Sequence, residues 1–439
     1  MKGVRSFLVL LVVATVLGGY LYYDSKHEPG DQKKQEKVYP GVVSDKIERV
    51  TVKSAAGDQT TVEKQGTAWQ VTQPSPAAAD EAELSGITSN LASLEIQRVV
   101  DEQATDLKQY GLDPARIEVG FKFAGKEQKL LLGQKTPTGS DLYARTPDKP
   151  RVFLVSSFLE STFNKSGFDL RDKTILKIDR DKVDHVEIET PERTLKVAKQ
   201  GADWRIASPV DARADFGAVE GIIGRLNTTP MKSIASPGAA DLKEYGLDKP
   251  AATVRVMSGS SQAGLAIGKS AGEGVVYAKD LSRPMIFTVE AGLLDELKKP
   301  ADDFRVKDLF DARSFNTRRI EIVRNGQTIT LEKDKDKPTW KQVAPSAKAA
   351  DAGKVEALMT ALTSARATSF VGQDKISGTG LQTPELTVSV SYEDGQKHEK
   401  VTFGRKGADA FARREGDASA AKIDTTALDG VLKAVDALK

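Results

Sequence analysis

The sequence predicts an α+β protein made of three tandem homologous domains of mainly antiparallel sheet with two helices each, after an N-terminal transmembrane helix. Three observations lead to this prediction: a glycine-centred turn that occurs three times, tryptophans that recur at nearly the same distance from each turn, and an apolar span near the amino terminus. We expect the three domains at residues 46–176, 177–312 and 313–439.

The recurring turn consists of a glycine, a leucine and, two or three residues later, a proline. Glycine adopts the left-handed conformation that ends a helical turn, and the leucine is expected to fold back on the Leu or Ile five residues earlier. The three glycines lie 135 and 134 residues apart, and they are Gly111, Gly246 and Gly380. This period suits a small domain and is too long for a solenoid repeat.

Other residues also recur at equivalent positions of the three copies. Each tryptophan is followed five residues later by a proline, and the tryptophans are Trp69, Trp204 and Trp340. An aspartate precedes an apolar helical pattern in every copy, as expected of a helix N-cap, and these residues are Asp80, Asp215 and Asp351. A further glycine ends a strand-like run in each copy, at Gly133, Gly268 and Gly404.

The first copy shows the pattern of one domain. Alternating or continuous apolar residues predict strands, at 47–52, 60–62, 69–71, 117–123, 130–132 and 152–155. Apolar residues at helical spacing after Asp80 predict a helix that lies on the sheet, and they are Leu84, Ile87, Leu91 and Leu94. A second, short helix is expected near residues 156–164, with counterparts near 290–299 and 426–438.

The amino terminus predicts a membrane anchor. Residues 7–23 contain no charge and would form a helix of about 25 Å, at the short end of a bilayer span. Lys2 and Arg5 precede the span, so we expect residues 1–23 to be a cytoplasmic tip and an anchor in the inner (cytoplasmic) membrane. The domains would then lie outside, in the periplasm or the extracellular space. No A-x-A cleavage pattern follows, so we expect an uncleaved signal anchor. Residues 24–45 are hydrophilic and are expected to be a linker.

The composition argues against a nucleic-acid partner and against sites that depend on cysteine. The chain has 64 basic and 62 acidic residues, and charges of both signs alternate instead of gathering into a basic stripe, so no nucleic-acid partner is expected. The absence of cysteine excludes disulfides, thiolate metal sites and a cysteine nucleophile.

No residue is predicted to be catalytic, cofactor-binding or metal-ligating. His185, Glu187 and Glu189 share one face of a strand, but a solvated face explains them better than a metal site. The glycine-rich stretches 259–264 and 268–274 do not open a helix and are expected to be hairpin loops. The in-phase tryptophans fit a core better than a carbohydrate-stacking platform.

Charged segments lie between the copies. Their residues are predicted to make inter-domain contacts, and they are Asp169, Arg171 and Lys173 in the first segment and Asp303, Arg305 and Lys307 in the second. Arginine among carboxylates can form paired hydrogen bonds at such a junction.

Together these motifs resemble the bacterial family known as domain of unknown function 4340. The resemblance rests on the Y-G-L-D-P turn at Tyr110–Pro114, the Leu132-Gly133 strand end, Thr136-Pro137, Tyr143-Ala144 and the exit segment from Asp169. It covers residues 46–439, and the third copy departs furthest, with Thr379 and Gln382 in place of tyrosine and aspartate. It implies a single-span envelope protein, often encoded beside ABC-type transport components similar to gliding-motility proteins, and no assigned activity.

The leading hypothesis is a non-enzymatic, membrane-anchored scaffold or accessory protein that associates with ABC-type transporter subunits. A wall- or polysaccharide-binding module would instead use the tandem copies for avidity and needs exposed aromatic side chains. A hydrolase would need a convergent acid–base set in one copy only.

Overall fold

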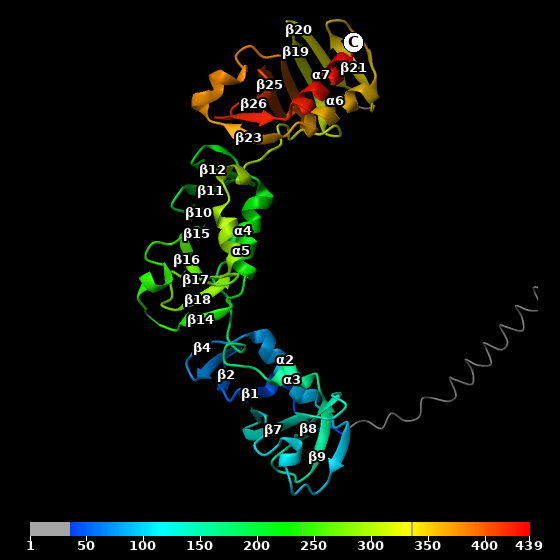
Figure 1. Ribbon diagram of the computed structural model, residues 1–439. Helices are drawn as coiled ribbons and strands as arrows, with labels where there is room; N and C mark the ends of the chain where they lie inside the picture. Colours follow the sequence, from blue (N-terminus) through cyan, green and yellow to red (C-terminus); the bar gives the residue numbers. More distant parts are fainter. Residues whose placement is uncertain (1–35, 239, 335–336) are drawn as a thin grey trace, which may run out of the picture. The chain divides into compact units, whose positions relative to one another are not determined.

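The computed structural model describes residues 36–238, 240–334 and 337–439 (Figure 1). The predicted transmembrane helix at 7–23 and most of the predicted linker lie outside these residues. Within them, no helix has the length and apolarity to cross a membrane. The chain forms two compact units, one ending at Lys173 with the first domain and one beginning at Thr174 with the second and third.

Each domain is a nine-stranded, fully antiparallel sheet with two α-helices among the described residues. In the first domain the strand order is β4-β3-β2-β1-β6-β7-β8-β9-β5, and the other two sheets repeat it. The three-domain repeat and the antiparallel sheets therefore agree with the sequence prediction, although the domains contain more strand and less helix than an even α+β mixture.

The elements of the first domain are β1 (Ile47–Lys53), β2 (Gln59–Gln65), β3 (Ala68–Gln73), β4 (Ala77–Ala78), α2 (Glu81–Ser93), β5 (Arg98–Asp101), β6 (Ile117–Phe123), β7 (Lys126–Lys135), β8 (Asp141–Arg145), β9 (Val152–Ser156) and α3 (Leu159–Phe163). Those of the second are β10 (His185–Glu189), β11 (Thr194–Gln200), β12 (Asp203–Ser208), β13 (Ala212–Arg213), α4 (Phe216–Thr228), β14 (Ser233–Ser236), β15 (Ala252–Ser258), β16 (Ser261–Gly272), β17 (Val275–Asp280), β18 (Ile286–Glu290) and α5 (Ala291–Lys298).

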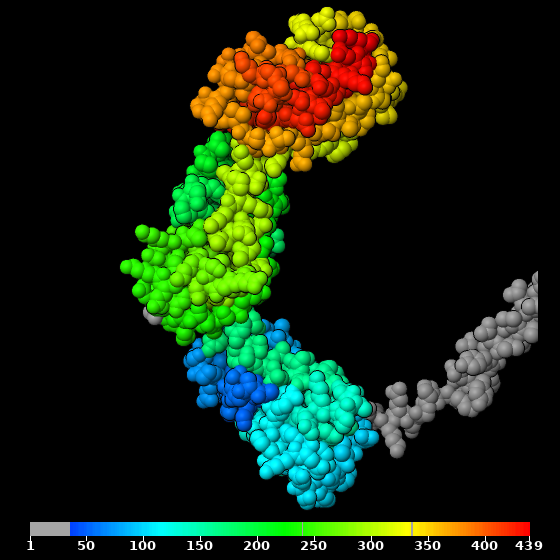
Figure 2. All heavy atoms as spheres, viewed as in Figure 1, coloured from blue at the N-terminus to red at the C-terminus, as the bar shows by residue number. Residues whose placement is uncertain are grey.

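Those of the third are β19 (Thr317–Arg324), β20 (Gln327–Lys333), β21 (Trp340–Ala344), β22 (Lys348–Ala350), α6 (Ala352–Ser364), β23 (Ala367–Val371), β24 (Leu386–Tyr392), β25 (Lys397–Lys406), β26 (Asp409–Arg414), β27 (Ala420–Ile423) and α7 (Thr425–Asp436). In this domain α6 contacts α7, and α7 (red) forms part of the outer surface in Figure 2.

The core of each domain lies between one face of the sheet and the helices. In β1, residues Ile47, Val50 and Val52 are fully buried, while the alternate residues are more exposed. Helix α2 turns Leu84, Ile87 and Leu91 into the same apolar cluster. This alternation is the signature of a sheet that has one covered and one solvated face.

The solvated face is held by cross-strand ion pairs. Lys53 on β1 lies 3.0 Å from Glu118 on β6, and Glu118 also pairs with Lys129 on β7. In the second domain Arg255 pairs with Glu189 at 2.6 Å. Opposite charges on directly adjacent strands favour the observed register.

The recurring glycine turn packs against the sheet at a second glycine. Gly111, Gly246 and Gly380 have φ values of 66°, 67° and 76°, and each ends a 3-10 helix: η2 (Lys108–Tyr110), η4 (Leu242–Tyr245) and η6 (Gln373–Thr379). The Leu112 N–H donates to the Leu107 carbonyl at 3.1 Å, which closes the turn.

The second glycine lies on the strand that faces this turn. A Cβ built on Gly133 of β7 would lie 2.0 Å from the carbonyl oxygen of Tyr110, and one on Gly268 of β16 would lie 2.1 Å from that of Tyr245. In the third domain the corresponding distance, from Gly404 to the Gly380 oxygen, is 2.8 Å. We call this contact between turn and strand the glycine contact. It explains why both glycines recur in every copy.

Candidate functional site

The in-phase tryptophans are structural. Their exposed fractions are 5%, 2% and 7% for Trp69, Trp204 and Trp340. A lysine of the neighbouring strand lies over each ring at 5.0–5.9 Å, and these lysines are Lys64, Lys199 and Lys333. The buried rings offer no surface for stacking a sugar, so a polysaccharide-binding function loses its main support.

The in-phase aspartates lie at helix N-termini. Asp80 accepts backbone N–H bonds from Ala82 and Glu83, both at 3.1 Å, at the start of α2. Asp215 and Asp351 accept in the same way at the start of α4 and α6. These carboxylates satisfy helix N–H groups that have no partner within the helix.

The residues of the best metal-like arrangement in the sequence each have a separate partner. Glu187 pairs with Lys196 at 3.0 Å, Glu189 pairs with Arg255, and His185 contacts Asp184 at 2.6 Å. Among the described residues, no group of three or more His, Asp or Glu side chains could hold a metal ion. The glycine-rich stretches form the β15–β16 and β16–β17 hairpins.

The charged exit segments extend the sheet edge next to the helix N-cap. In the first domain the Asp80 N–H donates to the Leu170 carbonyl at 3.0 Å; in the second the Asp215 N–H donates to the Phe304 carbonyl at 2.8 Å. Leu170 and Phe304 are buried. Both segments therefore complete the domain that precedes them.

The arginines of these segments have different partners. Arg171 donates to Ser75 and Lys173 pairs with Asp80 at 3.0 Å, and Asp169 accepts from Ser166, all within the first domain. Arg305 donates to Ser419 of the third domain. Asp303 and Lys307 pair with each other at 3.9 Å.

A segment before the first strand of each domain was not recognised from the sequence. Residues 37, 174 and 308 form isolated bridges to residues 95, 230 and 366, which follow the long helix of each domain. The next two residues of each segment are buried and apolar, and they are Val38 and Tyr39, Ile175 and Leu176, and Leu309 and Phe310. We call residues 36–42, 174–176 and 308–311 the entry segments. Residues 36–45, which the sequence assigned to the linker, thus include the first entry segment.

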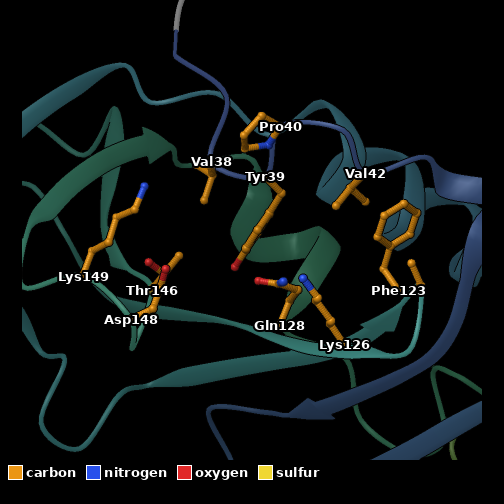
Figure 3. A pocket seen from close by; sticks show the side chains of 11 residues that line it. Val38, Tyr39, Pro40, Val42, Phe123, Lys126, Gln128, Thr146, Asp148 and Lys149 are labelled. Carbon is orange, nitrogen blue, oxygen red and sulfur yellow. The ribbon is translucent and has the colours of Figure 1, made fainter.

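The first entry segment covers a cavity of about 360 Å³ (Figure 3). One wall consists of residues 38–40 and 42 of the segment. The others come from the β6–β7 hairpin, with Phe123, Lys126 and Gln128, and from the β8–β9 hairpin, with Thr146, Asp148 and Lys149. The segment is fixed beside the cavity by paired hydrogen bonds from Arg151 to Glu36, which lower the pKa of that carboxyl.

Tyr39 is the polar group at the centre of this site. Its side chain is 6% exposed, and its ring packs edge-on against Phe121 at 4.9 Å. Its hydroxyl has no hydrogen-bond partner among the described residues, and Figure 3 shows it directed between Asp148 and Gln128. Burial, and then the Asp148 carboxylate, raise the pKa of Tyr39 far above its ordinary value, so the phenol stays neutral.

The same position differs in the other two domains. Strand register places Gln128, Ala263 and Glu399 opposite the equivalent core residues Phe121, Val256 and Val390. In the second domain a cavity of about 320 Å³ remains there, lined by Val256 and Ala263 among others. In the third domain the Glu399 carboxylate accepts the Asp311 N–H at 3.0 Å and pairs with Arg414 at 3.4 Å. Only the first of these three positions combines a cavity with an unpartnered buried hydroxyl among the described residues.

The third entry segment supports a prediction about pH. The Asp311 carboxylate lies 2.9 Å from Arg213 and 2.8 Å from Arg414. Burial favours its neutral form, but the two guanidinium groups outweigh burial and hold the pKa of Asp311 below its ordinary value. A lowered folded-state pKa stabilises the fold above the unfolded pKa of about 3.9, and this contribution is lost as the pH falls through the folded-state value.

We therefore expect Asp311→Asn to destabilise the unit of residues 174–439 by about 1 kcal/mol at neutral pH, because the carboxylate is partly exposed and screened. The difference from the parent should shrink as the pH falls below about 4 and disappear below the folded-state pKa of Asp311. Urea unfolding at several pH values measures it, with Asp394→Asn, whose pair with Arg318 is more exposed, as the control. A difference that grows on acidification would contradict the assignment.

Comparison with known proteins gives one family. The sequence model described as Domain of unknown function (DUF4340) matches residues 69–203 and 204–384. No curated protein matches the chain. Similar solved structures include two crystal structures of the DNA polymerase sliding clamp from Pseudomonas aeruginosa, one with ligand, at 9% and 8% identity. The two matches cover 88% and 87% of this chain and 93% and 92% of the clamp chains. Their TM-scores of 0.17 are too low to support an argument. The two matched segments span most of the three-domain region, and the chain belongs to the DUF4340 family.

Proposed function

We propose that the protein is a non-enzymatic, membrane-anchored accessory or scaffold protein on the outer side of the bacterial inner membrane, associated with an ABC-type envelope transport complex. One observation supports the scaffold role most directly. The residues that recur in all three domains form the glycine contact, the helix N-caps and the tryptophan cores, so what was kept between copies serves the fold.

The anchor at residues 7–23 rests on the apolar span. The transporter partner rests on the genetic neighbourhood that the family resemblance implies. In this proposal the span holds the domains at the membrane and the domains hold the partner. The polar, ion-paired face of each sheet remains on the surface for contact with other proteins.

Affinity purification of the full chain from native membranes tests the proposal. We expect ABC-type transporter subunits to be recovered with the parent, and also with a variant in which residues 1–23 are replaced by an unrelated single span. Recovery of no transporter subunit with either protein would overturn the association. Recovery that depends on the original span alone would assign the contact to the membrane segment instead of the domains.

A further inference from the structure

The cavity under the first entry segment combines three features that the fold itself does not use. It contains a buried hydroxyl without a partner, two lysines without ion pairs among the described residues, and an apolar wall. A buried polar group without a hydrogen bond costs free energy, and native proteins satisfy such groups with protein, water or ligand. The volume of about 360 Å³ lies within the range of roughly 300–1,000 Å³ typical of small-molecule sites.

The hydrogen-bonding groups of the cavity are mainly donors. The neutral Tyr39 hydroxyl can donate, as can the Gln128 amide and the ammonium groups of Lys126 and Lys149. Figure 3 shows these groups arranged around the same space, with Lys149 on the side away from Lys126. A ligand that satisfies them must present acceptor oxygen atoms.

The charges of the cavity wall favour a monoanion. Two lysines face one carboxylate, that of Asp148, so the wall carries a net charge of +1. One negative charge neutralises this wall, whereas a dianion would leave an excess negative charge beside the Asp148 carboxylate, and a cation would add to the charge of both lysines. Val38, Val42 and Phe123 add an apolar surface for a hydrocarbon or aromatic body.

We propose that the first domain binds a small organic monocarboxylate in this cavity, with its carboxylate at the Tyr39 hydroxyl and between the two lysines, and its apolar part against Val42 and Phe123. The third domain provides an internal precedent for a carboxylate at this position. There the carboxylate is the protein's own Glu399, held by the N–H group of Asp311 and by Arg414. The first domain has Gln128 at that register position and leaves the place of the carboxylate to a ligand.

Isothermal titration of the full chain in lipid nanodiscs, with empty nanodiscs as the blank, tests the proposal. The probes are hexanoate, hexanol, hexylammonium and inorganic phosphate. We expect hexanoate to bind and the other three to bind at least tenfold more weakly. Equal binding of hexanol would show that the cavity recognises only the apolar chain, which would overturn carboxylate recognition. Preferential binding of hexylammonium or phosphate would overturn the ligand class. Absence of hexanoate binding at millimolar concentration would overturn the proposal.

Variants locate the binding. Tyr39→Phe removes one hydrogen bond to a charged group and should weaken hexanoate about tenfold. Lys126→Gln and Lys149→Gln should each weaken it and reduce its salt dependence, whereas Asp148→Asn should strengthen it. The control is Tyr143→Phe, since Tyr143 lies on β8 of the same domain and does not line the cavity.

Thermal unfolding separates binding from folding. Tyr39→Phe removes an unsatisfied hydroxyl and keeps the ring, so its stability should equal or exceed that of the parent. Unchanged hexanoate affinity in a folded Tyr39→Phe protein would contradict the assignment. If that variant were poorly folded, the two lysine variants would test the assignment instead. Lys126 and Lys149 are exposed, so replacing them should leave the fold intact.

Discussion

Replacing Gly133 with alanine is expected to destabilise the first domain by about 3 kcal/mol. The added Cβ would lie 2.0 Å from the Tyr110 carbonyl oxygen and 3.1 Å from Cγ of Leu112. The first of these atoms belongs to the backbone of the turn that Gly111 closes, so it cannot move aside as a flexible side chain would. Relief therefore requires the turn to separate from β7.

Urea unfolding, monitored by hydrogen exchange of peptides from each domain, measures this effect. The control is Gly86→Ala, because Gly86 lies in α2 with open space around its Cα. Alanine there should be neutral or stabilise the helix by up to about 1 kcal/mol. Gly404→Ala should cost less than Gly133→Ala, since its closest contact is 2.8 Å. Equal effects of Gly133→Ala and Gly86→Ala would show that the glycine contact does not limit the fold.

Replacing Arg305 with alanine is expected to destabilise the junction between the second and third domains by about 2 kcal/mol. Only 6% of its side chain is exposed, and its guanidinium lies 3.4 Å from the centre of the Phe370 ring on β23. It also donates to Ser419 and pairs with Asp302 at 3.4 Å. Burial lowers the pKa of Arg305, but the group remains protonated.

The matched control is Arg171→Ala, because Arg171 has the equivalent place in the first exit segment and bonds to Ser75 of its own domain. Hydrogen exchange should accelerate in residues 301–307 and 367–371 of the Arg305→Ala protein, while the central strands β19 and β24 stay protected. Faster exchange throughout the third domain would instead mean that Arg305 is needed for the fold of that domain. Unchanged exchange in both segments would contradict its role at the junction.

The parts of the fold that sequence could predict are those with local physical signals. Positive φ at Gly111 and capping by Asp80 each depend on a few neighbouring residues, and the strands around Val50 and Val119 alternate clearly. Repetition of these signals at one period then indicated the number of domains.

The short strands could not be predicted because their pairing is distant. β5 contains two charged residues in four and pairs with β9, which lies about fifty residues later in the chain. Neither its alternation nor its length distinguishes it from a loop. The order of the nine strands likewise depends on contacts across the whole domain.

The candidate site depends on the same kind of distant contact. Tyr39 lies in a stretch whose polar composition predicted a linker. Its ring is buried against Phe121, and it lines the same cavity as the β8–β9 hairpin. A signal was nevertheless present. An apolar pair precedes each first strand, at residues 38–39, 175–176 and 309–310.

Amide hydrogen exchange of the intact chain tests most directly whether one folding unit occurs three times. The slowest exchange should be found in three equivalent pairs of central strands: β1 with β6, β10 with β15, and β19 with β24. The edge strands β5, β14 and β23 should exchange faster in every domain. A domain whose central pair exchanges as fast as its edge strand would contradict the account.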